Sequence, residues 1–130
     1  MKAPWSATFA ILACGVPLAA IAQTFPLDSV PPSDQELRLR ITGKTFHATL
    51  TGGDRLHIEY KPGGGFSSKT RFKADDSEYD DEAGWTTQNG KICRVDLEGA
   101  TVCNEVRIQG KDTYIQRDDG TVMKIEPDEK

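Results

Sequence analysis

Apolar and polar residues alternate with a period of two through most of the chain after Gly43. Such alternation is typical of β-strands that bury one face, and turn-forming residues interrupt it at short intervals. The pattern predicts strands at residues 44–51, 55–61, 65–73, 84–88, 91–97, 101–109, 112–117 and 121–127. We therefore expect an all-β fold, an antiparallel meander of about eight strands that forms a curled sheet or a small barrel.

One short N-terminal helix is expected ahead of the strands, over about residues 33–41. Ser33 and Glu36 have the spacing of a capping box, in which the two side chains bind backbone N–H groups at the start of a helix. Leu37 and Ile41 lie four residues apart, which places them on one helical face.

The apolar residues of the first predicted hairpin set its register. They all share one face if the pairs are Leu50 with Leu56, Ala48 with Ile58, and Phe46 with Tyr60. The loop is then residues 52–54, a three-residue connection. On the other face, this register places His47 opposite Glu59 and makes His57 a diagonal neighbour of His47.

The start of the chain has the features of a secretory signal peptide. Lys2 precedes the apolar run FAILACGVPLAAIA, and Ala20 and Ala22 form an A-x-A cleavage site. These features predict a signal peptide at residues 1–22 and a periplasmic or secreted product with no membrane span after cleavage. A retained membrane anchor and a lipoprotein cleavage box at Cys14 are the alternatives.

The predicted mature chain is small and acidic. Residues 23–32 hold three prolines without periodicity and predict an extended arm, which leaves 33–130 as a single β-rich domain. Of the 16 basic residues one lies in the signal peptide, so 15 remain against 20 acidic residues. Nucleic-acid binding relies on clustered Lys and Arg, so we expect no nucleic-acid partner for this acidic chain.

Cys93 and Cys103 are the cysteines of the predicted mature chain. An even number of cysteines in an oxidising compartment favours a disulfide over a zinc site, which needs more ligands nearby, or a redox pair, which has closer spacing. A hairpin with its loop at residues 97–99 sets the two cysteines opposite each other. Matching Val95 to Val102 instead requires a register shifted by one residue, which a bulge farther along the second strand reconciles.

Several short motifs resemble those of small exported proteobacterial proteins of unknown function. They are TGKTF after the capped helix, EYKPGGGF, GW, NGKICRV, and a second cysteine followed by a DG turn, and they span about Ser33 to Ile125. The resemblance implies a signal peptide, a helix and a β meander with a tryptophan and a cysteine pair. It implies no activity.

Six acids lie within the eight residues of DDSEYDDE, which the alternation assigns to a break between strands. A solvated loop, a calcium site and a docking surface for a cationic periplasmic or extracellular protein are the three interpretations weighed. The candidate partner-binding residues are Asp75, Asp76, Glu78, Asp80, Asp81 and Glu82.

Other candidate chemistry is sparse. His47, His57 and Glu59 are candidates for a divalent metal site or an acid–base pair, although histidines on a polar strand face are commoner at protein surfaces. Trp85 is expected in the core, with a ligand platform beside Arg94 as the alternative. The sequence shows no nucleophile motif, and we expect no cofactor and no assigned catalytic or metal residues.

We therefore interpret the chain as an exported β-rich protein, a non-enzymatic module that binds a protein or a small apolar ligand. One alternative is a weak metal-dependent enzyme that uses His47, His57 and Glu59. A second is a structural component of the envelope. Fold class alone does not decide among them.

Overall fold

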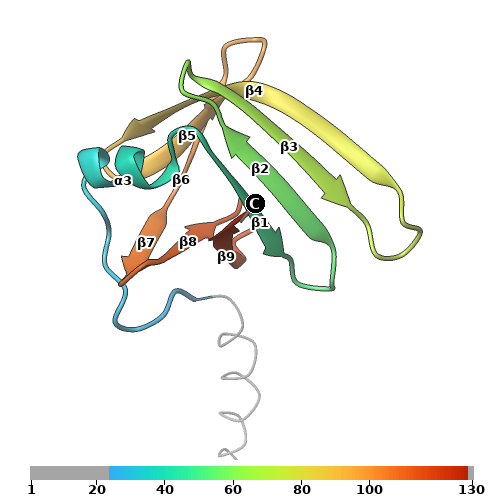
Figure 1. Cartoon of the computed structure of the whole chain (residues 1–130), viewed down its shortest axis with the longest axis horizontal. Helices are drawn as coiled ribbons and strands as arrows, with labels where there is room; N and C mark the ends of the chain where they lie inside the picture. Colours follow the sequence, from blue (N-terminus) through green and yellow to red (C-terminus); the bar gives the residue numbers. More distant parts are fainter. Residues whose placement is uncertain (1–23, 129–130) are drawn as a thin grey trace, which may run out of the picture.

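The computed structural model describes residues 24–128, so the predicted signal peptide at residues 1–22 lies outside the described part. One helix precedes nine antiparallel strands (Figure 1). The elements are α3 (Asp34–Ile41), β1 (Lys44–Thr49), β2 (Arg55–Tyr60), β3 (Gly65–Arg71), β4 (Glu78–Gln88), β5 (Lys91–Val95), β6 (Thr101–Asn104), β7 (Val106–Gln109), β8 (Asp112–Gln116) and β9 (Val122–Pro127).

The strands form one sheet in the order β6-β5-β4-β3-β2-β1-β9-β8-β7, which curls into a nearly closed barrel (Figure 1). The predicted all-β meander is confirmed. It has nine strands instead of eight because the expected strand at 101–109 is interrupted at Glu105. The first part, β6, pairs with β5, and the second part, β7, pairs with β8. This interrupted stretch therefore supplies both edges of the sheet.

Inward side chains from the strands, together with two from the helix, form the core. It includes Leu37, Ile41, Phe46, Leu50, Leu56, Ile58, Tyr60, Phe66, Trp85, Ile92, Ile115, Met123 and Ile125. The expected inward positions of β1 and β2 are confirmed, because these strands show alternating burial. Trp85 is also buried, as expected, and its indole N–H donates to the Lys61 carbonyl at 2.9 Å.

Half of the predicted capping box forms at the start of α3. The Ser33 hydroxyl accepts the Glu36 backbone N–H at 3.1 Å, whereas the Glu36 carboxylate contacts Arg40 at 3.5 Å. Leu37 and Ile41 are completely buried. The amphipathic spacing therefore anchors the helix, and the cap fixes where it begins.

The helix covers one end of the barrel. Arg40 donates to the Gly110 carbonyl in the β7–β8 turn at 2.6 Å. The Asp34 carboxylate accepts the backbone N–H groups of Asn89 and Gly90 at 3.2 and 2.6 Å, and it thereby holds the β4–β5 turn. These turns lie at the same end as the start of β1, so the β1–β2, β3–β4 and β8–β9 loops lie at the other end.

The proline-rich arm lies along the barrel beside β7. Val30 exchanges backbone hydrogen bonds with Ile108, at 2.9 and 2.7 Å. Arg107 donates to the Ser29 carbonyl at 3.0 Å, and its guanidinium lies 5.6 Å from the centre of the Phe25 ring. The arm is extended only in part, since a turn occupies Leu27 and Asp28.

The predicted faces of the first hairpin are right, but its register is wrong by two residues. The observed pairs are Phe46 with Ile58 and Ala48 with Leu56. The Leu50 backbone N–H instead donates to the Asp54 carbonyl at 2.7 Å, so the three-residue loop is 51–53. A shift of two preserves the alternation of faces, and burial alone therefore does not distinguish the two registers.

Candidate functional site

The open end of the barrel contains a cavity of about 490 Å³. The β1–β2, β3–β4 and β8–β9 loops surround its mouth and contribute Asp54, Phe72 and Arg117. The volume lies within the range common for small-molecule sites, which are concave and mainly apolar with a few polar groups.

The cavity has an apolar floor and a polar rim. Its floor consists of buried core side chains: Leu56, Ile58, Phe66, Ile92, Ile115 and Met123. Ser68, Thr70 and Asp81 line the wall, from the inward faces of β3 and β4, and Ser68 and Thr70 are the cross-strand partners of Ile58 and Leu56. An apolar molecule in this cavity would therefore contact buried carbon atoms and, beside them, polar side chains of the wall.

Tyr60 supplies a polar group to the apolar floor. Its ring contacts those of Phe46, Phe66 and Trp85, with centroid separations of 6.1, 5.6 and 5.5 Å. Only 3% of the residue is exposed, and burial raises the pKa of its phenol, while the charge of Arg94 lowers it by a smaller amount. The hydroxyl has no hydrogen-bond partner among residues 24–128.

Arg94 brings a positive charge into the same cavity. It is the cross-strand partner of Trp85 and projects from the inner face of β5, where it lines the cavity. One guanidinium nitrogen donates to Asp118 at 2.9 Å, and Asn104 donates to the other Asp118 oxygen at 2.8 Å. The hydrogen bond from Asn104 and, after it, the charge of Arg94 lower the pKa of Asp118.

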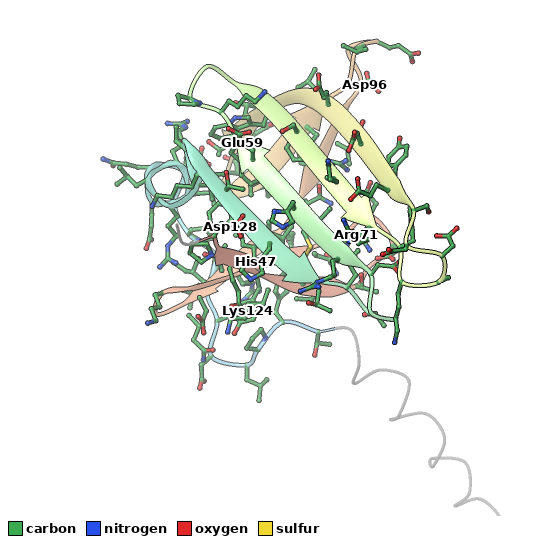
Figure 2. All side chains as sticks on the ribbon, turned by 45° about the vertical axis from the view of Figure 1, so that its right-hand side comes forward. His47, Glu59, Arg71, Asp96, Lys124 and Asp128 are labelled. Carbon is green, nitrogen blue, oxygen red and sulfur yellow. A yellow bond between two sulfur atoms is a disulfide. The ribbon has the colours of Figure 1, made fainter. Side chains whose placement is uncertain are left out.

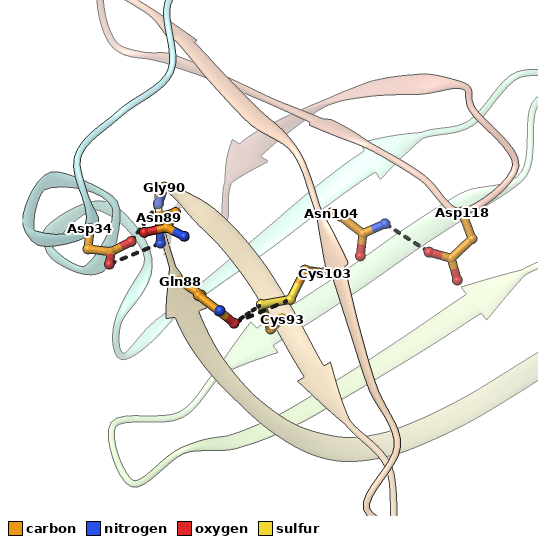
Figure 3. The surroundings of a disulfide bond; sticks show 8 residues. All are labelled: Asp34, Gln88, Asn89, Gly90, Cys93, Cys103, Asn104 and Asp118. Atoms are coloured by element: carbon orange, nitrogen blue, oxygen red, sulfur yellow. Dashed lines mark hydrogen bonds between the residues drawn. A yellow bond between two sulfur atoms is a disulfide. The ribbon is translucent and has the colours of Figure 1, made fainter.

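The predicted disulfide joins Cys93 and Cys103, with an S–S distance of 2.04 Å (Figure 3). These residues are direct partners in the β5–β6 hairpin, and the Asp96 backbone N–H donates to the Ala100 carbonyl at 3.0 Å, which confirms the loop at residues 97–99. Arg94, not Val95, pairs with Val102, which is 44% exposed, so the alternative apolar register is not used. The bridge holds the edge strand β6 beside the Asn104–Asp118 contact.

His47 and His57 lie directly opposite each other on the outer face, not diagonally. The predicted pairing of His47 with Glu59 is wrong: Glu59 pairs with Thr45 and Ser67, and no hydrogen bond or ion pair joins it to either histidine in the described chain.

Asp128 instead lies against both histidines, 3.3 Å from His57 Nδ1 and 2.6 Å from His47 Nδ1, as Figure 2 shows for His47. Its contacts fix the end of β9 against β1 and β2. These side chains line an open outer groove of about 770 Å³, whose other lining includes Arg55, Arg71 and Glu78. Within residues 24–128, no cluster of three or more His, Cys, Asp or Glu side chains has the arrangement of a metal site.

The sequence pattern predicted that the acidic segment, residues 75–82, is one loop between strands. This prediction is wrong. Asp75 and Asp76 lie in the β3–β4 turn, whereas Glu78 to Glu82 belong to β4 and pair with β3. Alternation sends Glu78, Asp80 and Glu82 to the outer face and Asp81 toward the cavity.

Basic residues on β3 neutralise part of this segment. Arg71 contacts Glu78 at 2.7 Å and Asp76 at 3.7 Å, while Lys69 contacts Glu78 at 3.6 Å and Asp80 at 4.0 Å. The hydrogen bond from Arg71, followed by the charge of Lys69, lowers the pKa of Glu78. High acid density in the sequence therefore gives a surface of mixed charge.

The cavity itself was not predicted from the sequence. Its wall includes polar side chains at inward positions, such as Ser68, Thr70 and Arg94. An alternating sequence pattern assigns such polar side chains to the solvent-exposed face. A usable signal was present in KICRV, where Arg94 follows the inward Ile92 at the interval of two residues that keeps the same face.

Comparisons of the chain with protein-family models, curated proteins and solved structures found no match. The resemblance to small exported proteins therefore stays a prediction. Within the described range 24–128, no helix has both the length and the apolar character needed to cross a membrane.

Proposed function

We propose that this protein is an exported binding module that holds a small, mainly apolar molecule in the open end of its barrel. The cavity of about 490 Å³ carries this proposal, because its floor consists of side chains from the hydrophobic core. The outer groove is larger, but mostly charged and polar side chains line it. Burial of apolar surface favours the inner cavity for an apolar ligand.

Export is part of the proposal. The signal-peptide pattern at residues 1–22 supports it, and so does the Cys93–Cys103 bridge, because disulfides persist in oxidising compartments. We place the mature protein in the periplasm or outside the cell. Intact mass spectrometry of the mature product should give the mass of residues 23–130, and protein recovered with residues 1–22 still attached would contradict this cleavage.

Two neighbouring serines allow a matched test of the cavity. Ser68 faces inward between Ile58 and Asp81, and Ser67 faces outward between Glu59 and Glu82. A tryptophan at Ser68 should fill part of the cavity, whereas a tryptophan at Ser67 should leave the cavity open.

The readout is the fluorescence of 1-aminoanthracene, an uncharged apolar probe, titrated with the mature protein. We expect Ser68→Trp to weaken probe binding about tenfold or more and Ser67→Trp to leave it unchanged. Circular dichroism checks that both variants fold. Equal binding to the two variants, or no binding to the wild type, would remove the cavity as the functional site.

A cationic protein partner is the second candidate. Asp76 and Asp80 support it, since their side chains are 80% and 72% exposed. Lys69 and Arg71 weaken the local negative field, so the acids that remain available are fewer than the sequence suggests.

The charge hypothesis predicts that a decalysine peptide binds the wild type at low salt and that Asp80→Asn with Glu82→Gln weakens this binding. Screening should abolish the difference at high salt, where the Debye length is short. Asp112→Asn is the control, because Asp112 lies on β8, away from the β3–β4 pair. Equal loss in the control and the test variant would contradict a site at the acidic segment.

A further inference from the structure

We propose that the ligand is a monocarboxylate with an apolar tail, and that Tyr60 and Arg94 donate hydrogen bonds to its carboxylate. This inference rests on the proposed function, because it assigns a ligand class to the same cavity. The apolar side chains of the lining supply the environment for the tail, and Tyr60 and Arg94, which line the same cavity, supply a polar contact that is specific for an acceptor group.

Tyr60 is suited to donate and not to accept. Burial raises the pKa of its phenol, so the neutral O–H form persists at physiological pH. Within the described chain its hydroxyl has no protein partner, although the residue is only 3% exposed. Buried hydroxyls are nearly always hydrogen-bonded, so a ligand acceptor in the cavity would satisfy this group.

Arg94 provides the positive charge. Its contact with Asp118 uses one terminal nitrogen, and the other guanidinium N–H groups have no hydrogen-bond partner within residues 24–128. A planar guanidinium matches the two oxygens of a carboxylate, and partial removal from water strengthens the contact. Its side chain is 31% exposed, which places the head group of the ligand partly within reach of solvent.

The acids around the cavity set the limit on ligand charge. Asp54, Asp81 and Asp119 line the cavity, and Asp118 already pairs with Arg94. Arg117 lies 3.7 Å from Asp119 and offsets part of this negative charge. Repulsion from these carboxylates opposes a polyanion such as a phosphate ester, whereas a single negative charge beside Arg94 is compatible with the site.

Three molecules with the same ten-carbon chain separate head-group recognition from apolar binding. Decanoate, decan-1-ol and decylamine are each used to displace 1-aminoanthracene from the mature protein. We expect decanoate to displace the probe at about tenfold lower concentration than decan-1-ol, because charged hydrogen bonds add to the same apolar contact. Decylamine should be the poorest of the three, because its ammonium group lies near Arg94.

Two substitutions assign the preference to the named donors. Tyr60→Phe keeps the ring and should weaken decanoate binding about fivefold, and Arg94→Gln about tenfold or more, with decan-1-ol unchanged in both. Tyr114→Phe and Arg55→Gln are the controls, because these residues lie on the outer face of β8 and β2. The controls should bind all three molecules as the wild type does.

The outcomes distinguish the two proposals. If the probe binds but decan-1-ol or decylamine displaces it at the same concentration as decanoate, the inference of a carboxylate ligand fails. The proposal that the cavity binds an apolar molecule is then retained. The inference also fails if Tyr60→Phe and Arg94→Gln weaken decan-1-ol and decanoate equally. If the wild type binds no probe at all, the proposed function fails and the inference with it.

Discussion

Loss of the Cys93–Cys103 bridge should lower the melting temperature of the mature protein by a large amount. The bridge closes a loop with a sequence separation of 10 residues. In the chain-entropy treatment, a loop of this length removes roughly 9 cal/mol/K from the unfolded chain, or roughly 3 kcal/mol at 25 °C. For a domain of this size each kcal/mol corresponds to roughly 4 °C, so we expect a decrease on the order of 10 °C.

The position of the bridge supports this magnitude. Strand β6 pairs only with β5, so it is an edge strand that the bridge holds in place. Cys93 is completely buried, and the contact between Asn104 and Asp118 lies at the end of the same strand. Release of β6 therefore also weakens the link between β6 and the β8–β9 loop.

Differential scanning calorimetry of oxidised and reduced protein measures the effect. A Cys93→Ala/Cys103→Ala variant is the control. Its melting temperature should be close to that of the reduced wild type and should not change when reductant is added. Peptide mass spectrometry of the non-reduced protein confirms that the bridge was present before reduction. A difference of under about 2 °C between oxidised and reduced protein would refute the entropic reasoning.

Three further predictions concern the helix cap, the core and Tyr60. Urea unfolding should show that Ser33→Ala costs about 1 kcal/mol, since it removes the cap of α3. In the same assay Ile58→Ala should cost about 2–5 kcal/mol and His57→Ala under about 0.5 kcal/mol, and the reverse ranking would contradict the inward and outward assignment of β2. Because burial raises the pKa of Tyr60, this residue stabilises the fold below its unfolded pKa of about 10, and the contribution is lost as pH rises above that value. Alkaline unfolding should therefore begin at higher pH in Tyr60→Phe, and identical profiles would contradict a buried, neutral phenol.

The alternation of apolar residues predicted the fold class and the faces of β1 and β2, whereas the two cysteines predicted the register of the β5–β6 hairpin. It did so because burial acts on every second residue, and a misplaced face would expose the whole apolar set. The register of the first hairpin was wrong by two residues, since Phe46 lies inward whether it pairs with Ile58 or Tyr60. The turn at 51–53 decides between these registers.

Two other differences come from tertiary pairing. The four acids among residues 78–82 have low strand propensity. They nevertheless form a strand, because Lys69 and Arg71 on β3 offset part of their charge across the strand pair. The interruption at Glu105 transfers the chain from one edge of the sheet to the other, which local sequence does not specify. The first of these effects shapes the cavity, because Tyr79 and Asp81 of β4 line it.

The order of strands also has a consequence for the course of folding. All but one of the pairings among the described strands join neighbours in sequence, and the exception is β1 with β9, where Phe46 meets Pro127. Short-range hairpins form quickly, whereas contact between distant segments requires closure of a long loop. The sheet can therefore grow as successive hairpins and close last, at the seam where Asp128 meets His47 and His57.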